Sequence, residues 1–137
     1  MGACGLPEVN RSSVLDAPKT IAIVDDNAAV LKGIARLLNA HGFATRTFAS
    51  AEAFLSSRPL VGVDCVLLDI QLGNISGIAV RRELAATGST LPVIFMTAFD
   101  DQVTRQQASD AGCVAYLRKP FPGSQLIEAI ARAAPGH

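Results

Sequence analysis

Five polar side chains of this 137-residue chain stand at or just after the ends of short apolar runs, where a buried strand would end. They are Asp25, Asp26, Asp69, Thr97 and Lys119. Three carboxylates, a hydroxyl and an ammonium group can together hold a divalent cation and a phosphoryl group, provided that the fold brings them to one place.

The carboxylates of Asp25, Asp26 and Asp69 would repel one another in a common cleft. At a separation of ~5 Å and an effective dielectric constant near 20, each pair costs about 3 kcal/mol. The group must therefore take up protons, splay apart or bind a cation. Neither histidine nor cysteine stands beside these residues, and a site made of oxygen ligands favours Mg²⁺ or Mn²⁺ over zinc.

The remaining polar residues fit phosphoryl chemistry. Lys119 supplies a positive charge for phosphate oxygens, and Thr97 supplies a hydroxyl donor. Asp69 stands alone at the end of an apolar run, and aspartate carboxylates form acyl phosphates, so we interpret Asp69 as the nucleophile. Taken singly, each residue has a plainer interpretation. Asp25-Asp26-Asn27 is typical of a helix cap, and Lys119 of a solvated lysine.

Short apolar runs alternate with stretches of helical periodicity along most of the chain. The predicted strands are residues 20–24, 43–48, 63–68, 91–96 and 114–117. The predicted helices run from Ala28 to before Gly42, from a cap at Ser50 through Leu55, over 78–86, from a cap at Asp100 or Asp101 to Ala111, and over 124–134.

Strands that alternate with helices predict right-handed crossovers and a parallel sheet with helices on both faces, an open doubly wound α/β domain. The carboxyl ends of parallel strands lie along one edge of such a sheet, where ligands bind. Because four of the five strands end in the polar residues named above, we expect these side chains to converge. We expect Phe43, Phe48 and Phe54 to lie in the core, and His41 to lie on the surface or cap a helix at the opposite edge.

Four separated motifs resemble the receiver domain of bacterial two-component response regulators. They are IAIVDD (21–26), CVLLD (65–69), FMTA (95–98) and YLRKPF (116–121). The resemblance covers residues 19–134, leaving a flexible leader over 1–18 and a tail over 135–137. It implies a flavodoxin-like five-stranded parallel sheet, in the order 2-1-3-4-5, with five helices, and a cis peptide bond between Lys119 and Pro120.

The resemblance also implies a role for each site residue. Asp69 accepts a phosphoryl group from the histidine of a sensor kinase or histidine phosphotransfer protein, and Thr97 and Lys119 contact that group. Asp26 binds Mg²⁺ directly, Asp25 does so through water, and the backbone carbonyl of Gln71 completes the protein ligands beside Asp69. Thr97 and Tyr116 form the switch, which acts on a partner or dimer surface made of the fourth helix, fifth strand and fifth helix. Catalysis is confined to the protein's own acceptor, so no enzyme with an external substrate is implied.

Two departures from the family pattern concern the loops beside the acceptor. Leu72-Gly73 replaces a common Met-Pro pair, which we expect to loosen the loop while Gly77 keeps its place. Gln71 and Phe99 occupy the positions two beyond the acceptor and the threonine, which tune phosphoryl lifetime in such domains. We hypothesise that the bulky Phe99 partly shields the phosphoryl group from water.

Three other functions compete with this one. An aspartyl-nucleophile phosphatase typically has an acid two residues after the nucleophile, where this chain has Gln71. A flavodoxin-type cofactor binder conflicts with the acidic first turn at Asp25 and Asp26, which repels phosphate. A receiver-shaped module that never takes phosphate is disfavoured by the complete acidic, threonine and lysine set.

The composition limits partners and location. Twelve basic residues balance twelve acidic ones, which disfavours direct binding to nucleic acid or an anionic membrane. The chain has three cysteines, Cys4, Cys65 and Cys113, which is an odd number, and their spacing is not that of a metal site. The sequence shows neither a signal peptide nor a membrane span. We therefore expect a cytoplasmic protein. Because only residues 135–137 follow the last predicted helix, the chain acts alone or is the front of a longer regulator. FASAEAFL (48–55) resembles receivers that precede helix-turn-helix domains and favours the second case.

Overall fold

The computed structural model describes residues 18–135. The predicted leader over 1–18 lies outside these residues except for its last position, as does most of the predicted tail over 135–137. Five strands form one parallel sheet in the order β2-β1-β3-β4-β5. They are β1 (Thr20–Val24), β2 (Ala44–Phe48), β3 (Cys65–Asp69), β4 (Val93–Thr97) and β5 (Ala115–Arg118). The predicted fold and strand order are therefore confirmed.

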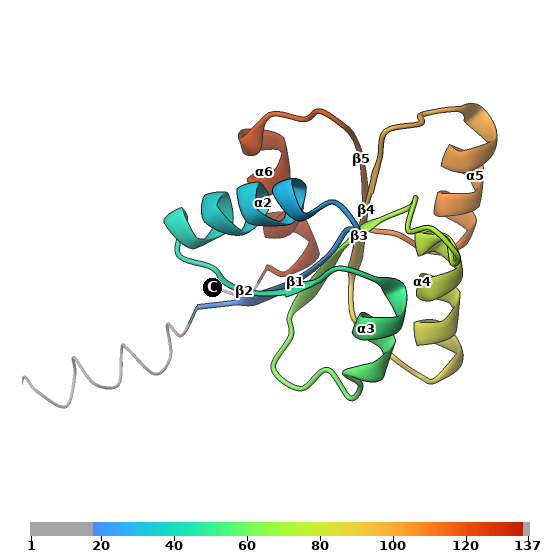
Figure 1. The fold of residues 1–137 in the computed structure, drawn as a ribbon, viewed down its shortest axis with the longest axis horizontal. Helices are drawn as coiled ribbons and strands as arrows, with labels where there is room; N and C mark the ends of the chain where they lie inside the picture. The colour runs from blue at the N-terminus through green and yellow to red at the C-terminus, as the bar shows by residue number, and fades with distance from the viewer. Residues whose placement is uncertain (1–17, 136–137) are drawn as a thin grey trace, which may run out of the picture.

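Four helices connect successive strands and a fifth follows β5, and these helices cover both faces of the sheet (Figure 1). They are α2 (Ala28–Ala40), α3 (Ala51–Ser56), α4 (Gly77–Ala86), α5 (Gln102–Asp110) and α6 (Gly123–Ala133). Helices α2 and α6 lie on one face, and α3, α4 and α5 lie on the other. This is the arrangement that right-handed crossovers produce in a doubly wound sheet.

Two core layers follow from the alternation of side chains along the strands. In β3, Val66 and Leu68 face the layer beneath α3, α4 and α5, whereas Cys65 and Leu67 face the layer beneath α2 and α6. All five residues of β3 are buried, as are all five of β4. Central strands with both faces covered explain the unbroken apolar runs in the sequence.

The strands end later than the apolar runs predict. Strand β3 includes Asp69, which pairs in register with Met96 of β4, and β4 includes Thr97, which pairs with Arg118 of β5. Backbone pairing continues through these polar residues because the ladder hydrogen bonds do not depend on side-chain polarity. Asp69 and Thr97 are thus held by the sheet and not by a loop.

Two polar residues near the predicted site, Asn27 and Asp101, cap helices. The side chain of Asn27 caps α2 by accepting hydrogen bonds from the amides of Ala29 and Val30, at 2.9 and 3.1 Å. Asp101 caps α5 in the same way through the amide of Thr104, at 2.7 Å. Asn27 therefore caps α2, and neither Asp25 nor Asp26 is its N-cap residue. Oδ1 of Asp25 accepts the backbone N–H of Asn27 at 2.9 Å.

The aromatic core prediction is confirmed in one case of three. Phe54 is fully buried, whereas Phe43 and Phe48 are only partly buried. Both of the latter lie at or beside β2, which is an edge strand and is covered on fewer sides than the central strands.

Cys65 is fully buried, Cys113 is half-buried, and both are free thiols. In residues 18–135, none of the helices combines the length and apolar character needed to span a bilayer.

Candidate functional site

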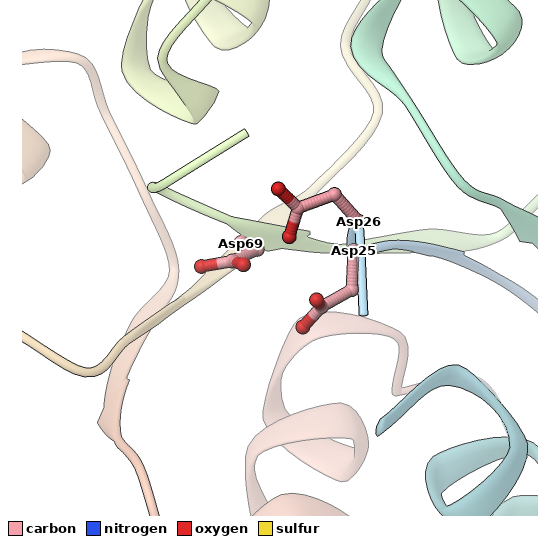
Figure 2. A group of neighbouring side chains, drawn as sticks. All are labelled: Asp25, Asp26 and Asp69. Atoms are coloured by element: carbon pink, nitrogen blue, oxygen red, sulfur yellow. The ribbon is translucent and has the colours of Figure 1, made fainter. Parts of the chain in front are cut away.

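The carboxyl ends of β1 and β3 bring the three predicted aspartates together. Carboxylate oxygens of Asp25, Asp26 and Asp69 all lie within 4.8 Å of one another. Figure 2 shows Asp25 and Asp26 extending to opposite sides of the end of β1, with Asp69 beside them. Asp25 and Asp69 are buried, whereas Asp26 is exposed. The predicted convergence of these acids is therefore present.

Lys119 reaches the same cluster from the end of β5. Its Nζ atom lies 2.7 Å from Oδ2 of Asp25 and 3.3 Å from Oδ2 of Asp69. The backbone N–H of Lys119 donates to the carbonyl of Thr97 at 2.8 Å, and the peptide bond to Pro120 is cis as predicted. One ammonium group thus bridges the two buried carboxylates.

The electrostatics leave this cluster short of positive charge. Burial, and then the charge of Asp25, raise the pKa of Asp69 to about 6, although Lys119 and the amide of Gln71 act in the opposite direction. Burial by itself lowers the pKa of Lys119, but its hydrogen bond to Asp25 and the charges of Asp69 and Asp25 outweigh this, and the pKa is raised. A charged lysine beside three carboxylates leaves a net negative site that a cation would stabilise.

The donor atoms of the cluster suit a hard divalent cation. All three side chains offer carboxylate oxygens, which are the ligands that Mg²⁺ prefers. Asp26, the exposed member, leaves one side of the group open to water, and Mg²⁺ keeps several waters in protein sites. The residues present therefore fit Mg²⁺. The backbone N–H of Gln71 donates to Oδ1 of Asp69 at 3.1 Å, while the role of its carbonyl as a ligand stays a prediction.

Thr97 lies at the end of β4 and is fully buried. Its hydroxyl lies 3.1 Å from Oε1 of Gln71 and 3.0 Å from the carbonyl of Phe99. The hydroxyl oxygen also accepts the N–H of Phe99 at 3.0 Å. Phe99 is 65% exposed. The side-chain contact between Gln71 and Thr97 has no signal in the sequence, because 26 positions separate the two residues.

The family model described as "Response regulator receiver domain" matches residues 21–131 of this chain. The chain belongs to the response regulator receiver domain family. The sequence resemblance to such domains is thereby confirmed, and the site described above lies inside the matched segment. Receiver domains are signalling domains, which is the functional class that this membership establishes.

Individual relatives agree with the family match. The chain is 33% identical to the response regulator protein TmoT of Ectopseudomonas mendocina over 92% of its own length and 57% of TmoT. It is 36% identical to the transcriptional regulatory protein FixJ of Rhizobium meliloti, over 84% of this chain and 56% of FixJ. This receiver domain spans about half the length of the curated relatives that it matches.

Solved structures show the same fold. The crystal structure of FixJ-N superposes with a TM-score of 0.80 at 36% identity, covering 85% of this chain and 93% of that one. A response regulator protein of Burkholderia pseudomallei, solved with a phosphorylated aspartic acid, a calcium ion and citrate, superposes with a TM-score of 0.74 at 25% identity. That alignment covers 81% of this chain and 65% of the other.

Gly77 lies close to the end of β3 in this receiver domain. Its N–H donates to the carbonyl of Ile70 at 2.9 Å. A Cβ atom placed on Gly77 would overlap the carbonyl oxygen of Asp69 and lie 3.0 Å from its carbonyl carbon. Only a glycine allows this approach without moving the backbone of Asp69. Leu72 is buried in the core beneath α4, so the replacement that we expected to loosen the loop is anchored there.

Tyr116, the predicted switch aromatic, lies on β5 beside α5. The guanidinium carbon of Arg105 lies 4.9 Å from the centre of its ring, and Arg105 is in turn held by Asp100 at 2.7 Å. The Tyr116 hydroxyl is buried without a hydrogen-bond partner among the described residues. Burial, followed by the charge of Asp100, raises the pKa of Tyr116. His41 caps the carboxyl end of α2, as predicted. Its Nδ1 atom lies 3.0 Å from the carbonyl oxygen of Leu37.

Proposed function

We propose that this receiver domain accepts a phosphoryl group on Asp69 from the phosphohistidine of a sensor kinase or histidine phosphotransfer protein. The observation that carries the proposal is the approach of three carboxylates within 4.8 Å, with Lys119 bridging the two buried ones. The B. pseudomallei regulator, a relative of the same fold, was solved with a phosphorylated aspartic acid.

The chemistry needs one nucleophile and charge neutralisation. A carboxylate oxygen of Asp69 attacks phosphorus, the P–N bond to the donor imidazole breaks, and that imidazole leaves and takes up a proton. Lys119 offers its charge to the phosphoryl oxygens, and Thr97 offers its hydroxyl once it leaves its present partners. Mg²⁺ held by Asp25, Asp26, Asp69 and the carbonyl of Gln71 would supply Lewis-acid stabilisation of the transferred group. The only acceptor for this chemistry is the domain itself.

The proposed output is a change in the surface made of α5, β5 and α6. Phosphorylation adds a charge of about −1.5 to −2 at Asp69, which favours a conformation in which Thr97 and Lys119 turn toward the phosphoryl group. Tyr116 then occupies the space that Thr97 leaves. Val103 at the start of α5 and Val114 just before β5 are exposed apolar residues that a partner or a second copy could contact. Because FixJ is a transcriptional regulatory protein, we propose control of transcription as the output.

Intact-mass spectrometry tests the acceptor directly. The protein is incubated with acetyl phosphate and Mg²⁺, and Asp69→Ala is compared with the parent chain. Asp110→Ala serves as a matched control, because Asp110 is an exposed carboxylate on α5 outside the cluster. We expect one phosphoryl adduct in the parent and in Asp110→Ala, and no adduct in Asp69→Ala or when Mg²⁺ is chelated. An undiminished adduct in Asp69→Ala would overturn the proposal.

A further inference from the structure

The side chain of Gln71 contacts the two donors that end β4. Its Oε1 atom lies 3.1 Å from the hydroxyl of Thr97 and 3.4 Å from the backbone N–H of Ala98. We propose that Gln71 is a positioning residue, a latch that holds Thr97 in the unphosphorylated receiver domain and competes with the phosphoryl group for it. The inference rests on the proposed phosphorylation of Asp69.

The orientation of the Gln71 amide follows from its partners. A backbone N–H can only donate, so the atom facing Ala98 must be an acceptor, which is the amide oxygen and not the nitrogen. With Oε1 in this place, the Thr97 hydroxyl is the donor in the second contact. Both hydrogen bonds therefore converge on one oxygen of Gln71.

The hydroxyl of Thr97 has a single proton, which makes its contacts mutually exclusive. It can donate to Oε1 of Gln71, to the carbonyl of Phe99 at 3.0 Å, or to a phosphoryl oxygen on Asp69, but to one of these at a time. Thr97 is fully buried while these partners are in place. A phosphoryl group thus gains this proton only when Thr97 stops donating to Gln71 or to Phe99, so the Gln71 oxygen competes with the phosphoryl group for it.

The backbone of Gln71 ties the latch to the acceptor. Its N–H donates to Oδ1 of Asp69 at 3.1 Å, so one residue contacts the nucleophile through its main chain and the switch hydroxyl through its side chain. A substitution of the side chain leaves the main-chain contact and the proposed carbonyl ligand in place. The latch can therefore be removed without removing any proposed ligand of the cation.

Beryllofluoride, a reversible analogue of the phosphoryl group, measures the competition. Its dissociation constant is determined in excess Mg²⁺ by calorimetric titration for the parent and for Gln71→Met, which keeps the length of the side chain but has no amide oxygen. Since one hydrogen bond is exchanged, we expect Gln71→Met to bind beryllofluoride about two- to tenfold more tightly. Gln71→Ala should act in the same direction.

Two controls separate a latch from a general effect of the loop. Asn74→Ala alters an exposed side chain of the same loop and should leave the affinity for beryllofluoride unchanged. In a Thr97→Val background the hydroxyl is absent, so Gln71→Met should no longer change that affinity. A gain that persists without the hydroxyl, or an equal gain in Asn74→Ala, would overturn the latch while the proposed function stands. Absence of beryllofluoride binding in the parent, with no difference from Asp69→Ala, would overturn both.

Discussion

Replacing Asp69 by asparagine should stabilise the receiver domain when divalent cations are absent. The pKa of Asp69 is raised from 3.8 to about 6 in the folded protein, first by burial and then by Asp25. The unfolded chain therefore releases its proton at lower pH than the folded one does. Stability contributed by the protonated carboxyl is complete below about pH 4 and is lost as the pH rises through 6.

The size of the effect follows from this shift in pKa. A difference of about two units corresponds to about 3 kcal/mol above pH 7, at about 1.4 kcal/mol per unit. Asparagine imitates the neutral carboxyl in shape and removes one of the converging charges. The full value of about 3 kcal/mol is an upper value, because the pairing of Lys119 with Asp25 changes when the charge of Asp69 is removed. We expect Asp69→Asn to raise the free energy of unfolding by about 1–3 kcal/mol at pH 8.

Urea denaturation at pH 8 with a chelator measures this change, and Asp110→Asn is the control for the loss of a carboxylate outside the cluster. The gain of Asp69→Asn over the parent should disappear near pH 4. Added Mg²⁺ should stabilise the parent more than the variant, since a ligand that binds only the folded state adds to its stability. An Asp69→Asn protein that is less stable than the parent at pH 8 without divalent cations would refute this account of the site.

Three further substitutions test other parts of the structure. Gly77→Ala should lower the free energy of unfolding by about 1–3 kcal/mol in urea titrations and slow phosphorylation by acetyl phosphate, because the new Cβ displaces the carbonyl of Asp69; equal stability would contradict this packing. Lys119→Met should tighten Mg²⁺ binding in calorimetry and slow phosphorylation, since the ammonium group competes with the cation for Asp25 and Asp69; weaker Mg²⁺ binding would count against it. Phe99→Ala should shorten the lifetime of the phosphoryl group, and an unchanged decay rate would exclude shielding by this ring.

The sheet and the convergence of the site were predictable because they depend on order along the chain. Apolar runs alternate with helical stretches, so the strands are parallel, and parallel strands bring Asp25, Asp69, Thr97 and Lys119 to one edge. The exact ends of β3 and β4 were not predictable from hydrophobicity, since backbone pairing extends into the polar residues. The half-burial of Phe43 and Phe48 depends on which strand lies at the edge of the sheet.

Details of the site depend on distances that no local pattern encodes. Asp25 and Asp26 are neighbours of the same type, yet the first is fully buried and the second is exposed. The family resemblance gives Gln71 a backbone ligand role and a position that tunes phosphoryl lifetime, but it does not predict that its side chain contacts Thr97 across two strand ends. Such contacts follow from the separation of β3 and β4 in the folded sheet and from rotamers that packing selects.

The central claim, that Asp69 becomes phosphorylated with Mg²⁺ present, is tested most directly by locating the modified residue. The protein is treated with acetyl phosphate and Mg²⁺, reduced with borohydride, which converts an aspartyl phosphate to homoserine, and digested for tandem mass spectrometry. We expect homoserine at position 69 alone, and none when Mg²⁺ is chelated. Homoserine at another aspartate, or a phosphoryl group found only on a different type of side chain, would contradict the account.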